Sequence, residues 1–491
     1  MKNFINTKLN KKIIFFSAVF FTVLLIINYS LPAQENKERP WKKFITNESL
    51  QLKIPDLKFF TLKNGIKVYF VNHKLLPRSF FSLYVYGTGF DEPDKQTGLN
   101  SLWGSMVTFS GSKEYPREKL AEYLEQRASS FSYSGGTERS SFSLSSLSHF
   151  FEDDLKLILS VIKNPQFLNE DFEILKQQTL KGIEKRKENP GSLAYIGSNL
   201  KFWENSIRGK ITTKETINSI SIEDLKKWQQ EMYKAERFTL LLAGDYDEEK
   251  IKPILNDTLG SLVIDEKNKI LDDALKVKPN NIKFTTFHIK KDLPQATVLL
   301  MTNGMKHSDE DYYPLKIYDF LLGGSSFNSE LTQKIRVKKG WAYSVYSHYS
   351  AGLYFGDIRI FAQTANENLF DLLREVNTIL LNPDSFAGKD KIMEAKKSLE
   401  NKFVFLYETP ESLLNTQLSL MWDGLSDDYL KNFIQKIEKV TNEDILKLAQ
   451  KYYNPENFFL VIVGPENLFA DKSKHKDIPW LKNIVSLEIP E

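Results

Sequence analysis

The sequence predicts an α+β fold that occurs twice, as a tandem repeat of two homologous α/β-sandwich domains. A chain of 491 residues is too long for one hydrophobic core, so more than one domain is expected. Matching residues recur at one spacing, because three pairs lie 220 residues apart: Glu223 and Glu443, Tyr233 and Tyr453, Gly244 and Gly464. Each half also combines strand-like alternation with helix-like periodicity. We therefore expect two units of about 210–220 residues, each with a largely antiparallel sheet packed against helices.

The elements expected in each half follow from their residue patterns. In the first half we predict strands at 67–71 and 81–86, a hairpin at 131–144 around Gly135-Gly136, and helices at 150–162 and 171–187. In the second half we predict strands at 297–301, 342–347 and 357–364, and helices at 312–322, 369–381 and 390–406. The domains are accordingly placed at 55–264 and 282–470, with a polar linker at 265–281 and a C-terminal tail at 471–491.

The N-terminus has the pattern of an export signal. Lys2, Lys8, Lys11 and Lys12 precede an uncharged apolar run at 13–27, and Ala33 offers a cleavage position. Residues 1–33 are thus predicted to be a signal peptide or, if uncleaved, a membrane anchor. Either role places the protein outside the cytoplasm, in the periplasm or anchored to the cytoplasmic membrane and facing outward.

Composition excludes several kinds of site. The chain has no cysteine, which rules out disulfides, thiolate zinc sites and iron–sulfur clusters. Its six histidines are scattered, so a metal site made from neighbouring histidines is not expected. The 66 basic and 63 acidic side chains nearly balance, and no basic stripe with interleaved aromatics predicts nucleic-acid binding.

The segment 99–109 is predicted to be an amphipathic helix with an unusual second face. Leu99, Leu102, Trp103, Met106 and Val107 follow helical spacing and form a core-facing stripe. The opposite face carries only small residues, namely Ser101, Gly104, Ser105 and Thr108. Such a face allows close packing or borders a cavity.

This helix and its surroundings resemble the active-site region of M16 metallopeptidases, the insulinase and mitochondrial-processing-peptidase family. The resemblance runs from Gly98-Leu99-Asn100-Ser101-Leu102-Trp103-Gly104-Ser105 to Asn164-Pro165-Gln166-Phe167, and the second half is similar to the family's C-terminal half. It implies a LuxS-like clamshell of two domains. Active members carry His-x-x-Glu-His here, in which the histidines bind Zn²⁺ and the Glu is the general base. A second Glu ligand follows further along the chain.

The resemblance also implies that this chain lacks the zinc chemistry. The two His positions hold Ser101 and Ser105, the base position holds Gly104, and the downstream ligand position falls at about Gly182, with Glu184 out of phase. Neutral hydroxyls are poor zinc ligands, and glycine cannot accept a proton. We therefore expect no metal in this chain. A serine nucleophile is much less favoured, because neither serine lies in a G-x-S-x-G elbow, and the acidic run after His307 is better explained as a solvated loop.

The second half keeps a different family feature. Arg336 is expected at a helix end and Tyr343 at the start of the next strand, within a segment similar to the family's Arg/Tyr pattern that includes Gly340-Trp341-Ala342. In the family this pair reaches toward substrate at the zinc site, where Arg and Tyr donate to a peptide carbonyl or oxyanion. Taken singly, Arg336 is more simply a helix-end cation and Tyr343 an ordinary strand residue. Together, inside a longer matching segment, the two residues favour the functional interpretation.

Two functions fit this combination. The first is a non-catalytic, substrate-binding subunit of a heterodimeric M16 peptidase for peptides or unfolded proteins, in which a partner subunit with an intact His-x-x-Glu-His motif holds the zinc. The peptide would add as a strand to a sheet edge, with 131–144 as the candidate region. The alternative is a stand-alone peptide- or protein-binding scaffold without a protease role. An independently active hydrolase is the weakest hypothesis.

Overall fold

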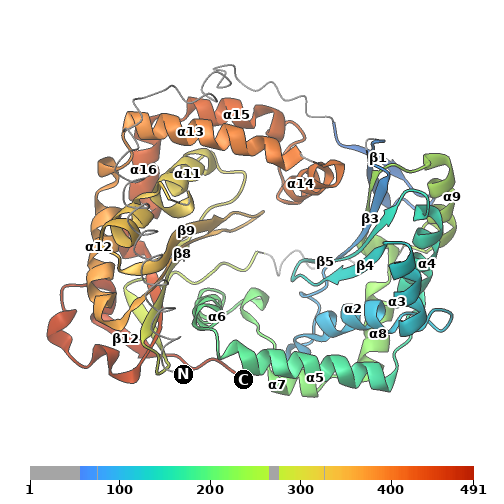
Figure 1. Cartoon of the computed structure of the whole chain (residues 1–491), viewed down its shortest axis with the longest axis horizontal. Coiled ribbons are helices and arrows are strands. Elements are labelled where there is room, and N and C mark those ends of the chain that lie inside the picture. The colour runs from blue at the N-terminus through green and yellow to red at the C-terminus, as the bar shows by residue number, and fades with distance from the viewer. Residues whose placement is uncertain (1–55, 75, 265–275, 326, 408) are drawn as a thin grey trace, which may run out of the picture. The chain divides into compact units, whose positions relative to one another are not determined.

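The structure is a computed structural model that describes residues 56–74, 76–264, 276–325, 327–407 and 409–491 (Figure 1). The predicted signal or anchor at 1–33, and most of the predicted linker, lie outside these ranges. No helix within them is both long enough and apolar enough to cross a membrane.

The first half forms a six-stranded mixed sheet in the order β1-β2-β6-β3-β5-β4. Its strands are β1 (Lys58–Thr61), β2 (Lys67–Asn72), β3 (Arg78–Tyr86), β4 (Ser130–Ser134), β5 (Arg139–Leu147) and β6 (Phe238–Gly244). Only β2 and β6 pair in parallel, and the remaining pairs are antiparallel. The predicted hairpin at 131–144 is confirmed as β4 and β5, with β4 at the edge of the sheet.

The second half repeats this sheet in the order β12-β7-β11-β8-β10-β9. Its strands are β7 (Thr285–Lys290), β8 (Gln295–Asn303), β9 (Ala342–Ser350), β10 (Asp357–Ala365), β11 (Phe459–Gly464) and β12 (Asn483–Ser486). One outer strand differs between the halves, because β12 comes from the predicted C-terminal tail and pairs in parallel with β7, whereas β1 is antiparallel to β2. The second sheet therefore extends beyond residue 470.

Helices pack on one face of each sheet and complete the sandwich (Figure 1). In the first half they are α2 (Leu99–Ser110), α3 (Arg117–Gln126), α4 (Phe151–Lys163), α5 (Asn169–Arg186), α7 (Lys214–Asn218), α8 (Ile222–Met232) and α9 (Glu248–Thr258). In the second they are α11 (Tyr312–Asp319), α12 (Leu369–Leu381), α13 (Lys389–Phe403), α15 (Tyr429–Lys439) and α16 (Asn442–Tyr452). Two π-helical segments, η5 (Phe320–Gly324) and η6 (Thr332–Lys338), stand near β9.

The residues that recur 220 positions apart lie on or after two helices that begin in the same way. Both α8 and α16 begin with a capping box, in which Ser221 pairs with Asp224 and Thr441 with Asp444. Each box satisfies two backbone groups at the first turn. The buried strands β6 and β11 follow these helices and end at Gly244 and Gly464.

One helix from each half packs against the sheet of the other half. Helix α6 (Pro190–Phe202) lies on β8 and β11, and α14 (Pro410–Trp422) lies on β2 and β6. Each helix has Pro as its first residue, and the residue before it, Asn189 or Thr409, caps the helix with its side chain. Tyr84 donates a hydrogen bond of 2.6 Å to Asn415 of α14. The two prolines are 220 residues apart, so this exchange is part of the repeat.

Candidate functional site

Helix α2 occupies the position where the family resemblance places the zinc motif. The predicted stripe of apolar residues is buried, and Trp103 donates a 2.7 Å hydrogen bond to Gln229. At the start of the helix, the Glu92 carboxylate accepts hydrogen bonds from the backbone amides of Gly98 and Asn100 at 3.2 and 2.7 Å. Burial raises the pKa of Glu92, and these two amide donors oppose the shift. The helix is thus fixed firmly at its N-terminal end.

The four motif positions carry no ligand. Ser101 is exposed, Ser105 is half-buried, and Gly182 on α5 is exposed with nothing near its absent side chain. Glu184 lies two residues after Gly182 on α5 and pairs with Lys214 at 2.9 Å. Within the described ranges no three His, Asp or Glu side chains come together as a metal site would require.

The position of the general base is filled by an aromatic ring. A Cβ atom added at Gly104 would lie 2.2–2.3 Å from three ring carbons of Tyr133, which belongs to the edge strand β4. Tyr133 also stands edge-on to Trp103, with ring centroids 6.0 Å apart. A carboxylate side chain at residue 104 is therefore sterically incompatible with this packing.

The hydroxyl of Tyr133 locks the ring in place. It donates to the carbonyl of Asn100 at 3.1 Å and lies 3.0 Å from the Ser140 hydroxyl. Ser140 in turn contacts the Asn100 amide at 2.9 Å and Thr88 at 2.8 Å. Burial raises the pKa of Tyr133, so the phenol stays neutral. The degenerate site is a packed, hydrogen-bonded structure.

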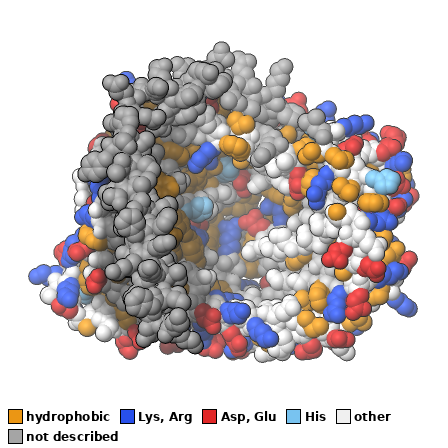
Figure 2. Space-filling model, viewed as in Figure 1, with side chains coloured by type: hydrophobic (Ala, Val, Ile, Leu, Met, Phe, Trp, Pro, Cys, Tyr) orange, Lys and Arg blue, Asp and Glu red, His pale blue; other side chains and the backbone are white. Residues whose placement is uncertain are grey.

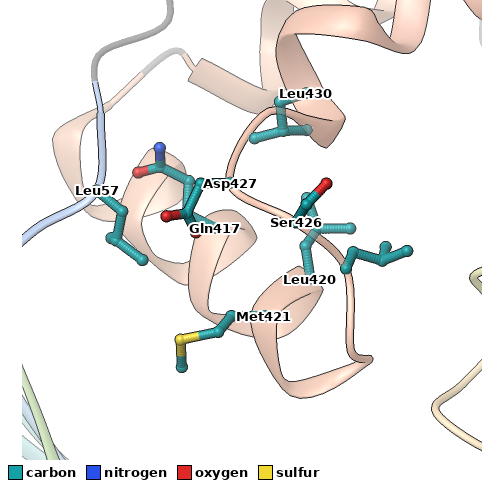
Figure 3. Close-up of a pocket in the computed structure, with 8 residues that line it drawn as sticks. Leu57, Gln417, Leu420, Met421, Ser426, Asp427 and Leu430 are labelled. Atoms are coloured by element: carbon teal, nitrogen blue, oxygen red, sulfur yellow. The ribbon is translucent and has the colours of Figure 1, made fainter.

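A polar pocket of about 190 Å³ lies beside Ser101. Its lining combines the start of α2, the β4–β5 turn and the segment before α7, and consists of Gly89, Glu92, Thr97, Gly98, Asn100, Ser101, Gly135, Gly136, Thr137, Ile207, Lys210 and Thr212. Another pocket, at the end of α14, encloses only about 10 Å³ and is lined by the residues drawn in Figure 3. That volume holds no more than one water molecule, so it is no ligand site.

The edge strand β4 presents hydroxyl groups on one face. Its residues Ser130, Ser132 and Ser134 are exposed, and their partners across the ladder are also serines, at 145, 143 and 141. The strand has no charged residue or proline of the kind that usually protects a sheet edge. On the other sheet, an added Cβ at Gly323 of η5 would lie 2.2 Å from the backbone nitrogen of Ser347, so η5 packs closely against the edge strand β9.

Arg336 and Tyr343 come together as the spacing predicted. The guanidinium carbon of Arg336, on η6, lies 5.1 Å from the centre of the Tyr343 ring and 5.4 Å from that of Phe327. The turn between them contains Gly340 with φ 65°, and the Gly340 amide donates to the Arg336 carbonyl. Both rings are largely exposed, Tyr343 to 82% and Phe327 to 61%. The Phe327 contact was not predictable from the sequence, because it depends on the path of the loop before η6.

The Arg336–Tyr343 pair and the α2 positions are not joined by a described hydrogen bond or ion pair.

His307, considered above as part of an acidic run, bonds to Asp423 at 2.8 Å and to Tyr429 at 3.2 Å. Its side chain is 10% exposed, so the prediction of a solvated residue is wrong for His307, which is packed. These contacts tie the loop after β8 to the end of α14.

Two family models match the chain. One, described as insulinase (peptidase family M16), matches residues 68–200, and one described as peptidase M16 inactive domain matches residues 219–385. Together they take in more than half of the sequence. The chain belongs to the M16 peptidase family. The predicted fold class and the predicted resemblance are thereby confirmed.

Curated relatives of this M16 protein carry differing names. A "Non-peptidase homolog YmxG" of Helicobacter pylori is 26% identical over 415 residues, which is 81% of this chain and 91% of the relative. An "Uncharacterized zinc protease" of Rickettsia bellii is 24% identical over 416 residues, or 83% of this chain and 97% of the relative. Full-length similarity in this family therefore includes proteins named as peptidases and as non-peptidases.

Solved structures agree on the fold. The peptidase M16 inactive domain from Pseudomonas fluorescens superimposes with a TM-score of 0.73 at 23% identity, covering 84% of this chain and 98% of that one. The periplasmic protease PqqL from Escherichia coli gives 0.71 at 15% identity and covers 90% of this chain, which corresponds to half of PqqL. At these identities the likeness extends to the fold alone.

Proposed function

We propose that this M16 protein is a non-catalytic, substrate-binding subunit of a heterodimeric zinc peptidase that acts outside the cytoplasm on peptides or unfolded proteins. The observation that carries the proposal is Tyr133, whose ring fills the space of the general base beside Gly104. That packing leaves no room for a carboxylate side chain at residue 104. Here the region is rebuilt as stable packing, which supports a lasting role without zinc chemistry.

The second support is the geometry of Arg336 and Tyr343. The Tyr343 ring holds the guanidinium at 5.1 Å, and no carboxylate among the described residues neutralises Arg336. Its donors remain available for a peptide carbonyl or carboxylate, and the exposed Tyr343 hydroxyl adds another donor. The pair would complete the active site of a partner subunit that holds zinc with an intact His-x-x-Glu-His motif.

The peptide itself would bind along β4. A strand added to this edge gains main-chain hydrogen bonds that do not depend on sequence. The neighbouring serine hydroxyls are small and uncharged, so they exclude neither bulky nor charged peptide side chains. Binding of unfolded polypeptides of varied sequence follows from this chemistry. Export is supported by the apolar N-terminal run, and the name of PqqL places one relative of this fold in the periplasm.

The test is to purify this chain alone and together with an M16 chain from the same genome that has the intact motif. We expect no bound zinc and no peptide cleavage alone, and chelator-sensitive cleavage on mixing. Arg336→Ala and Tyr343→Phe should each lower turnover of the mixture about tenfold or more while the complex still forms. Chelator-sensitive cleavage by this chain alone would refute the proposal. A partner that is equally active by itself would favour the stand-alone scaffold.

A further inference from the structure

A pocket of about 400 Å³ lies next to the Arg336–Tyr343 pair and has no place in the function proposed above. It is formed by η5, the loop before η6 and one face of α13. Its lining includes Phe320, Leu321, Phe327, Lys391, Glu394 and Lys402. Phe327 connects the two features, because its ring both lines the pocket and lies 5.4 Å from the Arg336 guanidinium.

The chemistry of this Phe327 pocket is apolar inside and positive at its margin. Phe320, Leu321, Phe327 and Ala395 give it an apolar floor. Lys391 is neutralised by Glu394 at 3.0 Å, whereas Lys402 has an aromatic partner only, with Nζ lying 5.1 Å from the Phe320 ring. Neither Lys402 nor Arg336 has a carboxylate partner among the residues that the structure describes. The local charge is therefore positive.

We propose that the Phe327 pocket binds a bulky apolar side chain of a peptide whose neighbouring acidic side chain is held by Arg336 and Lys402. Phe327 and Tyr343 are two exposed aromatic residues whose rings both lie within 5.4 Å of the Arg336 guanidinium carbon, and exposed apolar groups that gather in one place mark interaction sites. The occupant follows from charge complementarity, since a carboxylate pairs with the free guanidinium fork and the apolar side chain covers Phe327. This inference rests on the proposed function and adds a preferred substrate class, namely acidic peptides with aromatic or large aliphatic residues.

The proposal is tested by fluorescence anisotropy with the full chain and four labelled peptides. Each peptide is a Gly/Ser-rich strand with one central pair, Glu-Phe, Gln-Phe, Lys-Phe or Glu-Ala. We expect Glu-Phe to bind about tenfold more tightly than each of the others, which is the effect of one good contact. Added salt should weaken Glu-Phe binding more than Gln-Phe binding. Equal affinity for all four peptides would overturn the proposal.

Matched variants locate the binding. Phe327→Ala and Lys402→Gln should each reduce the preference for Glu-Phe about tenfold, while Lys338→Gln and Met393→Ala, at exposed residues outside the pocket lining, should leave it unchanged. Because Phe327 is 61% exposed, we expect Phe327→Ala to leave the melting temperature unchanged. Thermal unfolding of each variant checks this. If the two control variants reduce the preference equally, the pocket is not the site.

The two proposals fail in different ways. If the pocket is wrong but the subunit role is right, Arg336→Ala lowers turnover of the mixed enzyme, and Phe327→Ala leaves both binding preference and turnover unchanged. If the pocket is right but the subunit role is wrong, the preference for Glu-Phe persists and depends on Phe327, although no partner gains activity from this chain.

Discussion

Two glycines at former motif positions sit in opposite surroundings. Gly104 faces the Tyr133 ring, whereas Gly182 faces open space on an exposed side of α5. Replacing Gly104 with Ala forces the ring or the helix to move, and we expect a loss of about 1–3 kcal/mol in the free energy of unfolding. The same replacement at Gly182 removes backbone entropy from the unfolded chain and should stabilise the protein by about 0.5–1 kcal/mol.

Urea unfolding of both variants measures these effects, and each is the control for the other. Tyr133→Ala combined with Gly104→Ala should be less destabilised than the sum of the two single changes, because the clash is gone. Destabilisation of equal size at both glycines would show that the Tyr133 contact has no special weight.

Two charged residues on α11, the buried Asp319 and the partly buried Lys316, make stability depend on pH. Asp319 accepts a 2.6 Å hydrogen bond from Ser347, and Lys316 donates to Tyr349 at 3.0 Å. Burial raises the pKa of Asp319 to about 6 and lowers that of Lys316 to about 8. Both ions are therefore held in the folded protein near pH 7 at a cost.

Replacing Asp319 with Asn removes the contribution of this carboxyl group to the pH dependence of the free energy of unfolding. Because the folded state raises the pKa of Asp319, its favourable contribution is complete below about pH 4 and is lost as the pH rises through 6. The wild type should thus lose about 2 kcal/mol relative to Asp319→Asn between pH 4 and 6. Urea unfolding at a series of pH values measures the difference.

The matched control is Asp477→Asn. Arg374 lowers the pKa of exposed Asp477 to about 2, so its titration lies below pH 4 and its effect should stay flat between pH 4 and 6. A flat difference for Asp319→Asn as well would mean that Asp319 is ionised in the fold without penalty.

Single elements were predictable from sequence where one periodicity decides them. The α2 stripe, the β4–β5 hairpin and the stop at Gly340 follow from local patterns, and each is confirmed. Tyr133 is different, because only its register in β4 shows which face of α2 it covers. The exchange of α6 and α14 also escaped prediction, since an apolar helix face does not identify the sheet on which it packs. The Phe327 contact was not predictable either, because it depends on the path of the loop before η6.

The crossing of α14 to the first sheet predicts an effect of one half on the other. Leu418 is fully buried against Tyr69 and Leu241 of that sheet. Its replacement by Ala should cost about 2–5 kcal/mol and increase hydrogen exchange in β2 and β6, although both strands lie far away in sequence. Leu381→Ala, at a leucine that is 60% exposed on α12, should change stability by less than about 0.5 kcal/mol. Unchanged exchange in β2 and β6 would mean that the α14 contact is not energetically important.

At the scale of the whole molecule, charged residues of both signs and apolar groups are interspersed on the face drawn in Figure 2. No extended patch of one sign appears among its described residues. The described residues of this face therefore form no one-sign stripe of the kind that binds a nucleic-acid backbone.

The last residues of the chain join elements from both halves. After β12, the Leu487 amide donates to the His288 carbonyl, and Leu487 and Ile489 pack in the cluster that contains α6. Glu491 then accepts a 2.8 Å hydrogen bond from the Lys214 amide at the start of α7, and its carboxylate pairs with Lys187. Residues 487–491 thus connect β7 of the second sheet to helices of the first half.

Removal of residues 487–491 should therefore loosen the first half at α7. We expect faster hydrogen exchange in α6 and α7 and a loss of about 1–3 kcal/mol, mainly from the partly buried Leu487 and Ile489. The control is Lys187→Gln, which removes only a partly exposed ion pair and should cost less than about 1 kcal/mol. If exchange in α7 is the same with and without this segment, the contacts of Glu491 do not hold the two halves together, and other contacts, chiefly those of α6 and α14, must do so.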